Sequence, residues 1–189
     1  MRNEIKSQLL DSAKVKKRLS VEYLDVIEEA AVTLLDCIKS GHKVLLCGNG
    51  GSAADAQHLA AEMVVRLRLD RKPIRAISLT TDTSLITAMT NDYGFEDLFA
   101  RQVEALGDEG DVLIGITTSG NSENVIRAVK KAKQMGLKSI VLTGKGGGRI
   151  NNLADIMIIV PSNDVQRIQE SHITIGHILC DIMEKGLFG

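Results

Sequence analysis

Short apolar runs and helical patterns alternate along this sequence from residue 43 onward, and this alternation limits the fold more than any other feature. Five runs rich in Ile, Leu and Val each end beside Gly, Ser or Thr, and apolar residues spaced three and four apart follow each run. Helical crossovers of this kind are what parallel strands require. Because the runs are almost continuously apolar, both faces of the sheet should be covered. We therefore predict an α/β fold with five parallel strands, over 43–47, 75–79, 111–117, 138–142 and 155–160.

Two amphipathic helices are expected before the first strand, over about 5–19 and 20–40, and Gly41 stands where a helix C-cap belongs. The remaining helices are expected over 52–67, 83–89, 96–106, 121–135 and 164–185. There is no repeat, low-complexity tract or proline-rich linker. The sequence therefore predicts one domain over 1–189, with residues 1–40 as an N-terminal helical pair.

Charge and composition exclude several classes of partner. A net charge of -1, 3% aromatic residues and no Trp leave neither a basic surface nor stacking platforms for nucleic acid. No stretch reaches the roughly 18 apolar residues of a membrane span. The first residues lead into a charged helix and not into the apolar core of a signal peptide. We expect a cytoplasmic protein with a small-molecule partner, and no nucleic acid or membrane.

The three cysteines, Cys37, Cys47 and Cys180, are far apart and stand within apolar patterns. Buried free thiols explain them, because a cysteine zinc site needs closely spaced pairs.

The first predicted strand runs into a glycine-rich turn that fits the dinucleotide pattern Gly-x-Gly-x-x-Ala at Gly48, Gly50 and Ala53. A dinucleotide site also needs an acidic residue at the end of the next strand, which here ends Ser-Leu-Thr. Three interpretations stay open: a nicotinamide dinucleotide site, a tight turn with no ligand, and a helix N-terminus where backbone donors and Ser52 bind an oxyanion or sugar hydroxyls.

Four hydroxyl side chains cluster where the third predicted strand meets its helix: Thr117, Thr118, Ser119 and Ser122. One of them would suffice as an N-cap. A phosphate group offers several acceptor oxygens, so phosphate binding explains the cluster better than capping alone. The glycine-rich segment 143–148 lacks the Lys-Ser/Thr ending of a P-loop and is predicted to be a flexible turn.

His58 and Glu62 stand four residues apart on the helix after the first glycine turn, with apolar or small neighbours that suggest burial. The last helix carries Gln169 and His177, eight residues apart. Two imidazoles, a carboxylate and an amide oxygen could together bind a borderline-soft metal ion. For His172 on the same helix, a hydrogen-bonded core residue is the simpler interpretation, and His42 is predicted to have no role.

These motifs together resemble the phosphoheptose isomerases, enzymes of the SIS (sugar isomerase) fold, over nearly the whole chain. The matching residues are Cys-Gly-Asn-Gly-Gly-Ser at 47–52, Asp55, His58, Glu62, Asn-Asp-Tyr-Gly-Phe at 91–95, Thr-Ser-Gly-Asn-Ser at 118–122, Leu-Thr-Gly-Lys at 142–145, Arg-Ile-Gln-Glu-x-His-Ile at 167–173, and His177. The hydroxyl loop marks the wider superfamily, whereas Glu62 with Gln169 and His177 marks the isomerase.

The resemblance implies a three-layer, flavodoxin-like five-stranded parallel sheet and a homotetramer with active sites between subunits, in which the N-terminal helices serve oligomerisation. It implies an aldose-ketose isomerase that converts sedoheptulose 7-phosphate to D-glycero-D-manno-heptose 7-phosphate through a cis-enediol. That reaction is the first step of ADP- or GDP-heptose biosynthesis for surface glycans: lipopolysaccharide core, capsule or S-layer.

By position, the resemblance implies that Glu62 and His177 are the catalytic acid/base pair and that zinc, without a nucleotide cofactor, is held by His58, Glu62, Gln169 and His177. Arg66 would reach a neighbouring subunit's site, although Val65 stands where related sequences have Gly. The implied substrate contacts are Asn49, Gly50, Gly51, Ser52, Glu62, Arg66, Asn91, Asp92, Thr117, Thr118, Ser119, Ser122 and Gln169.

Proteins of this fold also serve two other functions. A tetrameric replication-initiator-associating binding protein has a similar Gly-Asn-Gly loop and helix, but lacks the catalytic carboxylate. A regulator that senses sugar phosphates would carry a DNA-binding domain, for which no residues are left. Glu62 with Gln169 and His177 therefore favours the isomerase, and turnover of sedoheptulose 7-phosphate discriminates between the two classes.

Overall fold

A single all-parallel sheet forms the centre of the molecule, in the strand order β2-β1-β3-β4-β5. The computed structural model describes residues 1–189. The strands are β1 (Val44–Gly48), β2 (Ala76–Ser78), β3 (Val112–Thr117), β4 (Lys138–Thr143) and β5 (Ile156–Ile159). Each lies within a predicted run or extends it by one residue, so the predicted parallel sheet is confirmed.

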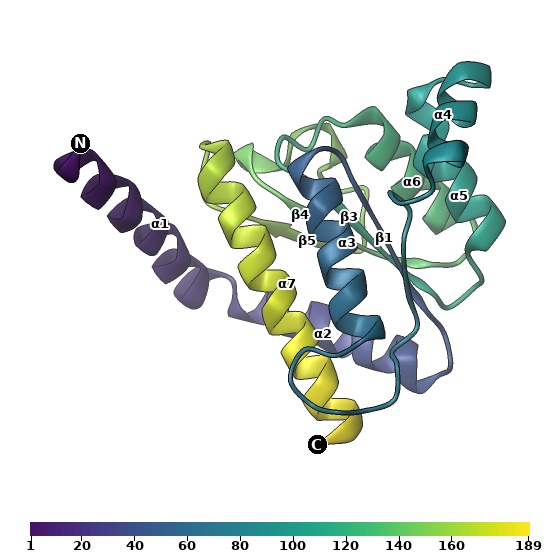
Figure 1. The fold of residues 1–189 in the computed structure, drawn as a ribbon, viewed down its shortest axis with the longest axis horizontal. Coiled ribbons are helices and arrows are strands. Elements are labelled where there is room, and N and C mark those ends of the chain that lie inside the picture. Colours follow the sequence, from purple (N-terminus) through teal and green to yellow (C-terminus); the bar gives the residue numbers. More distant parts are fainter.

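Helices cover both faces of the sheet, which gives three layers (Figure 1). On one face pack α2 (Leu24–Lys39), α3 (Gly51–Val64) and α7 (Val165–Phe188), and on the other pack α5 (Leu98–Leu106) and α6 (Glu123–Gln134). Strand residues alternate between these cores: Val44 and Leu46 enter the first, whereas Leu45 and Cys47 enter the second. The α/β fold is thus built around two continuous apolar layers.

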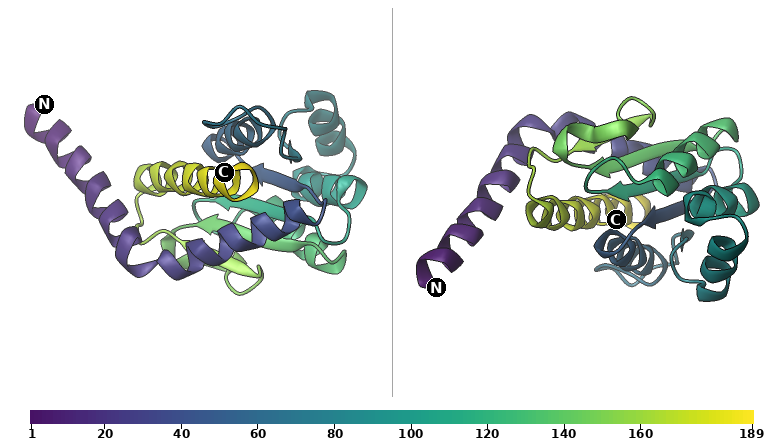
Figure 2. Two further views of the ribbon diagram at one scale, coloured as in Figure 1. Left: turned by 90° about the horizontal axis from the view of Figure 1, so that it is seen from below. Right: turned by 90° about the horizontal axis from the view of Figure 1, so that it is seen from above.

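The N-terminal helix α1 (Arg2–Glu22) projects away from the rest of the molecule (Figure 2). Leu19 is its only buried residue, and Ile5, Leu9 and Leu10 are 54%, 67% and 50% exposed. The break between α1 and α2 lies at Tyr23 and not near residue 20 as predicted. The apolar face of α2, which includes the buried Ala30 and Leu34, packs on this chain's own core.

The other helices also begin or end away from the predicted positions, α7 ending three residues later at Phe188. Helix α3 stops at Val64, three residues early, because the backbone N–H groups of residues 67–69 donate to a side chain of α7 and not to helix carbonyls. Helix α4 spans Thr83–Asp92, and the segment predicted as one helix over 96–106 consists of the short η1 (Phe95–Asp97) and α5.

The turn after β4 is a correction to the sequence analysis. It forms the 3-10 helix η2 (Lys145–Ile150), in which three consecutive glycines have positive φ angles, including 93° at Gly147. A Cβ on Gly120 would overlap the backbone of Gly147, and the N–H of Ile150 donates to the carbonyl of Gly120 at 2.9 Å. The segment is therefore packed tightly against the β3–α6 loop and is not a flexible turn.

All three cysteines are buried and unpaired, as predicted. Burial raises the pKa of Cys47 and of Cys180 to about 12, so both thiols stay protonated. None of the helices combines the length and the hydropathy needed to cross a bilayer.

Candidate active site

The carboxyl ends of β1 and β3 carry the two loops that the sequence analysis selected, and a pair of amides joins them. The side-chain amide of Asn49 donates to Asn124 at 2.8 Å, and that of Asn124 donates back at 2.9 Å. Asn124 is buried in the first turn of α6. Sequence reasoning gave this residue no role, because an Asn after a hydroxyl-rich loop has no distinctive spacing. The reciprocal bonds fix the two loops relative to each other.

The β1–α3 turn is shaped to let two other segments approach its backbone. Gly50 has a φ of 56°, in the left-handed region that favours glycine. A Cβ on Gly51 would overlap the Gln169 side-chain amide, so the end of that side chain lies directly against the glycine. No side chain caps α3, and Ser52 is buried in its first turn. The structure thus brings Gln169 to the first glycine loop.

The hydroxyl cluster after β3 is not engaged in helix capping. Ser122 occupies the N-cap position of α6 but its side chain makes no cap bond, and its Oγ lies 3.0 Å from Thr117 Oγ1. Ser119 Oγ accepts the N–H of Asn121 at 3.2 Å. Thr118 and Ser119 are half-buried. Free N–H groups at the start of α6 and these hydroxyls together offer several donors to an anion.

His58, Glu62 and His177 meet on the outer side of α3 and α7. His58 Nε2 lies 3.1 Å from Glu62 Oε1 and 3.3 Å from His177 Nε2. The two imidazole rings meet edge to face, with centroids 5.0 Å apart. The expected burial is not found: the side chain of Glu62 is 21% exposed and that of His58 is 47% exposed. This cluster therefore lies open to the surface of the single chain.

The cluster fits a bound metal ion. One ligand atom from each of the three side chains lies within 4.8 Å of the others. The two short separations, 3.1 and 3.3 Å, match the edge of about 3.3 Å that a tetrahedron with metal–ligand bonds of about 2.0 Å would have. Imidazole nitrogens and a carboxylate oxygen are donors that zinc accepts.

A further carboxylate, Asp55, belongs to the same surroundings. It lies about one turn before His58 on α3, and its Oδ2 is buried without a hydrogen-bond partner. Burial raises the pKa of Asp55, and the nearby imidazoles of His58 and His177 partly offset this. Asp55 is one of the residues that carry the resemblance, but the sequence alone gives it no role. Its spacing of three from His58 and seven from Glu62 was the available signal.

Several predicted residues lie apart from this cluster. Asn91 and Asp92 end α4, are exposed and bond to each other at 2.7 Å. Arg66 is exposed in the loop after α3. His172 is fully buried, and its Nε2 lies 3.2 Å from the Thr143 carbonyl, which confirms the core interpretation.

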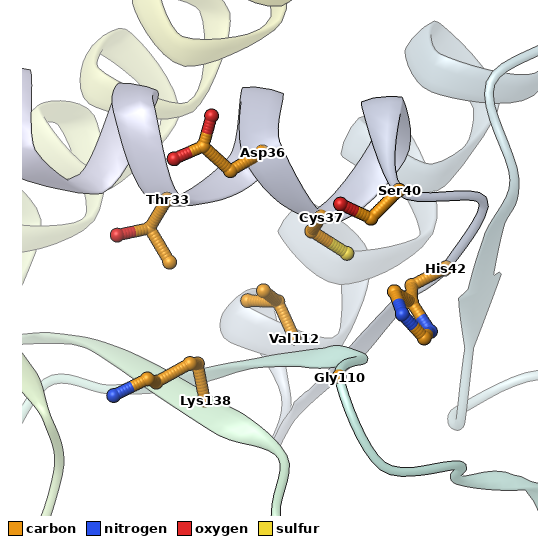
Figure 3. A pocket seen from close by; sticks show the side chains of 8 residues that line it. All are labelled: Thr33, Asp36, Cys37, Ser40, His42, Gly110, Val112 and Lys138. Atoms are coloured by element: carbon orange, nitrogen blue, oxygen red, sulfur yellow. The ribbon is translucent and has the colours of Figure 1, made fainter.

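His42 lies at the opposite, amino end of the sheet. There it lines a polar pocket of about 310 Å³ between α2 and the starts of β3 and β4 (Figure 3). Asp36 and Lys138 line the same pocket, but no group of potential metal ligands forms there. The candidate site residues lie elsewhere, on the loops after β1 and β3 and along α3 and α7.

Comparison with known proteins identifies the family. The SIS domain model matches residues 10–144. The chain is 53% identical to the phosphoheptose isomerase of Clostridium acetobutylicum over 100% of this chain and 97% of that protein. It is 54% identical to that of Aquifex aeolicus, over 98% and 97%. The chain belongs to the phosphoheptose isomerases of the SIS domain family. The structure of a phosphoheptose isomerase from Francisella tularensis agrees, with a TM-score of 0.94, 42% identity and 97% coverage of both chains.

One departure from the phosphoheptose isomerase pattern has no backbone consequence. Val65, which stands where relatives were expected to have Gly, has φ -87° and ψ -79°. These angles lie in the right-handed helical region, which any residue adopts. The direction of Arg66 therefore does not depend on a glycine before it.

Proposed function

We propose that this chain interconverts sedoheptulose 7-phosphate and D-glycero-D-manno-heptose 7-phosphate, supplying heptose for surface glycans. The observation that carries this proposal is the contact between His58, Glu62 and His177 on α3 and α7, two helices whose N-terminal turns meet at the loop after β1. Membership of the phosphoheptose isomerases supports the reaction class.

The reaction needs two proton-transferring groups. Moving a carbonyl from C2 to C1 requires a base that removes a proton from carbon, and an acid that serves the sugar oxygens while a cis-enediol forms. Glu62 and His177 are the proposed pair. One carboxylate and one imidazole suffice, because the group that removes the proton can return it to the neighbouring carbon.

The phosphate end of the substrate is assigned to the hydroxyl loop: Thr117, Thr118, Ser119 and Ser122. Ser52 and the backbone of Gly50 and Gly51 would bind hydroxyls or phosphate oxygens from the β1–α3 side. Asn49, Asn91, Asp92 and Gln169 are proposed sugar contacts. The hydroxyls of the loop bond only to neighbours within it, which leaves acceptor and donor capacity for a phosphate group.

Zinc is the proposed metal, held by His58, Glu62, Gln169 and His177. When bound, it would polarise the substrate carbonyl as a Lewis acid. The edge lengths of the three-residue cluster and the buried, unpartnered Asp55 Oδ2 nearby support a cation at this place. Gln169 is the proposed fourth ligand by resemblance. Its amide lies against Gly51, about two helical turns before His58 on α3, and would have to turn toward the cluster to bind the ion.

A homotetramer is the proposed assembly, with residues 1–40 used in its contacts. Exposed Ile5, Leu9 and Leu10 on a helix that leaves the domain support this proposal. The exposed His58 supports an active site that a neighbouring subunit closes, with Arg66 reaching across. The direct test of function is turnover of sedoheptulose 7-phosphate by the purified chain, lost in the folded Glu62→Gln variant.

A further inference from the structure

A buried ion pair holds the end of α3 against α7, outside the residues assigned to the site. Arg71 Nε donates to Glu184 Oε2 at 3.0 Å, and the two side chains are only 3% and 1% exposed. The Arg71 guanidinium also lies 5.6 Å from the centre of the Phe188 ring. A buried ion pair commonly gives no more stability than apolar residues of the same size would. This pair therefore calls for an explanation besides stability.

Arg71 closes the C-terminal end of α3. Its Nη2 donates to the carbonyl of Glu62 at 2.8 Å, and its Nη1 donates to that of Met63 at 2.7 Å. These carbonyls belong to the last turn of the helix, where carbonyl groups have no N–H donor within the helix itself. The positive charge also complements the negative end of the helix dipole. The backbone of Glu62, a proposed catalytic residue, is thus held directly by Arg71.

Glu184 completes the connection from the side of α7. Besides Arg71, its carboxylate accepts the backbone N–H groups of Leu67, Arg68 and Leu69 at 3.0, 2.8 and 2.7 Å. Four donors thus converge on one carboxylate. The same three amides are those that would otherwise continue α3, so Glu184 fixes where that helix ends and where the following loop turns.

The pair contacts the same two helices that carry the proposed acid and base. Glu184 stands about two helical turns beyond His177 on α7, and Arg71 grips the turn of α3 that carries Glu62. Closer to the site, a Cβ on Gly176 would overlap the side chain of Leu59, so the helices are in tight contact there as well. A shift of α3 along α7 would change every distance in the His58, Glu62 and His177 cluster.

We infer that Arg71 and Glu184 are positioning residues, which set the register of α3 against α7 and thereby the placement of Glu62 relative to His177. This inference rests on the proposed function for its kinetic consequences. Neither side chain touches the hydroxyl loop between β3 and α6. The pair should therefore control the chemical step and not phosphate binding.

The kinetic test uses Glu184→Gln and Arg71→Lys in the full chain. The glutamine can still accept backbone N–H groups but presents an amide to Arg71, and a lysine ammonium cannot reach Glu184 and both carbonyls together. A misplacement of the proton-transferring groups by about 1 Å lowers kcat by up to roughly 100-fold. We expect each variant, assayed well below its unfolding temperature, to lose about 10- to 100-fold in kcat while KM changes less than about 3-fold.

The control is Arg68→Gln. Arg68 Nε pairs with Asp181 at 3.0 Å between the same loop and the same helix, but the Arg68 side chain is 72% exposed. The Arg68→Gln variant should keep kcat within about 2-fold of the wild type, because it removes only an exposed ion pair. Folded Glu184→Gln and Arg71→Lys variants that unfold at lower temperature yet keep the wild-type kcat would overturn the inference, because the pair would then serve stability alone.

A crystal structure of Arg71→Lys gives a readout that needs no substrate. We expect the Nε2 atoms of His58 and His177 to lie farther apart than the 3.3 Å of the unaltered chain. An unchanged separation would overturn the inference. If the unaltered chain failed to convert sedoheptulose 7-phosphate, the proposed function would fail, and this structure would still decide whether the pair sets the register.

Discussion

The Nε2 atoms of His58 and His177 lie 3.3 Å apart, although 119 residues separate the two histidines in the chain. Neither residue could meet the other without the close contact of α3 and α7. Gly176 permits that contact at the level of Leu59, and the Gln169 amide lies directly against Gly51. The site is therefore a product of helix packing as much as of its own side chains.

Zinc content is the first prediction. Metal analysis of the purified chain should give about one zinc per chain, and His58→Ala should lose most of it, because one of two imidazole ligands is removed. His42→Ala is the matched control, since His42 lies in the polar pocket at the opposite end of the sheet and should leave zinc content unchanged. Equal zinc content in His58→Ala and the unaltered chain would contradict the assigned ligands.

Substrate affinity should depend on the hydroxyl loop. Ser119→Ala and Ser122→Ala should each raise KM by about 10-fold or more, the effect of losing a hydrogen bond to a charged group, with a smaller change in kcat. Competitive inhibition by inorganic phosphate should weaken in parallel. Ser40→Ala, which alters a hydroxyl of the opposite pocket, is the control. If both loop variants kept the wild-type KM, the two hydroxyls would serve only to hold the loop in shape and would not bind the substrate phosphate.

Assembly should require the exposed face of α1. Leu9→Asp with Leu10→Asp should reduce the mass measured by light scattering at micromolar concentration, because both side chains are exposed in the single chain and their burial would be lost. Activity should fall with the mass if sites lie between subunits. An active, stable monomer of the unaltered chain would contradict the tetramer.

Mixing experiments should show whether Arg66 acts across an interface. Oligomers formed from Arg66→Ala and Glu62→Gln chains should recover part of the activity, because some interfaces pair an intact Glu62 with an intact Arg66. Each variant alone is the control. Demonstrably mixed oligomers without recovery would place Arg66 outside the neighbour's site.

Acid should destabilise the fold in two separate pH ranges. Burial, partly opposed by the Thr143 carbonyl, lowers the pKa of His172 from 6.5 to about 4. As the pH falls, His172 binds a proton in the unfolded chain before it does so in the folded chain. The contribution of neutral His172 to the free energy of unfolding is therefore full above pH 6.5 and is lost as the pH falls toward 4. Burial would raise the pKa of Glu184, but its N–H donors and Arg71 outweigh burial and lower it from 4.5 to about 2. The contribution of ionised Glu184 to the free energy of unfolding is full above pH 4.5 and is lost as the pH falls toward 2.

Denaturant unfolding at a series of pH values measures both ranges. His172→Gln keeps a donor for the Thr143 carbonyl but cannot titrate, so the slope between pH 6.5 and 4 should flatten in that variant while the slope below pH 4 remains. The same slope in both proteins between pH 6.5 and 4 would contradict the assignment to His172.

The sequence predicted the strands almost to the residue because their signal is local: an unbroken apolar run bounded by Gly, Ser or Thr. It also predicted the core role of His172 and the meeting of His58 with Glu62, since a spacing of four on a helix brings side chains together. Prediction from the sequence failed where contacts between residues far apart in the chain determine the structure. Helix α3 ends at Val64 because Glu184 takes the next amides, and nothing near Val64 in the sequence indicates this.

Two expectations about burial failed for a related reason. The N-terminal helical pair was expected to serve oligomerisation, but Leu34 in its second helix is fully buried against this chain's own core, as Ile27 largely is. His58 was expected to be buried but is about half exposed. Periodicity identifies the apolar face of a helix but not the surface that covers it. For the same reason, the glycine-rich composition of residues 143–148 predicted a flexible turn and gave no indication that Gly147 packs tightly against Gly120.

The most direct test of the proposed function is steady-state turnover of sedoheptulose 7-phosphate by the unaltered chain, Glu62→Gln and His177→Ala. Each variant removes one proton-transferring group, so each should lower kcat by roughly 100-fold or more while circular dichroism and oligomer mass stay unchanged. Near-normal turnover by either folded variant would contradict the acid/base assignment. No turnover by the unaltered, zinc-loaded chain would contradict the proposed function itself.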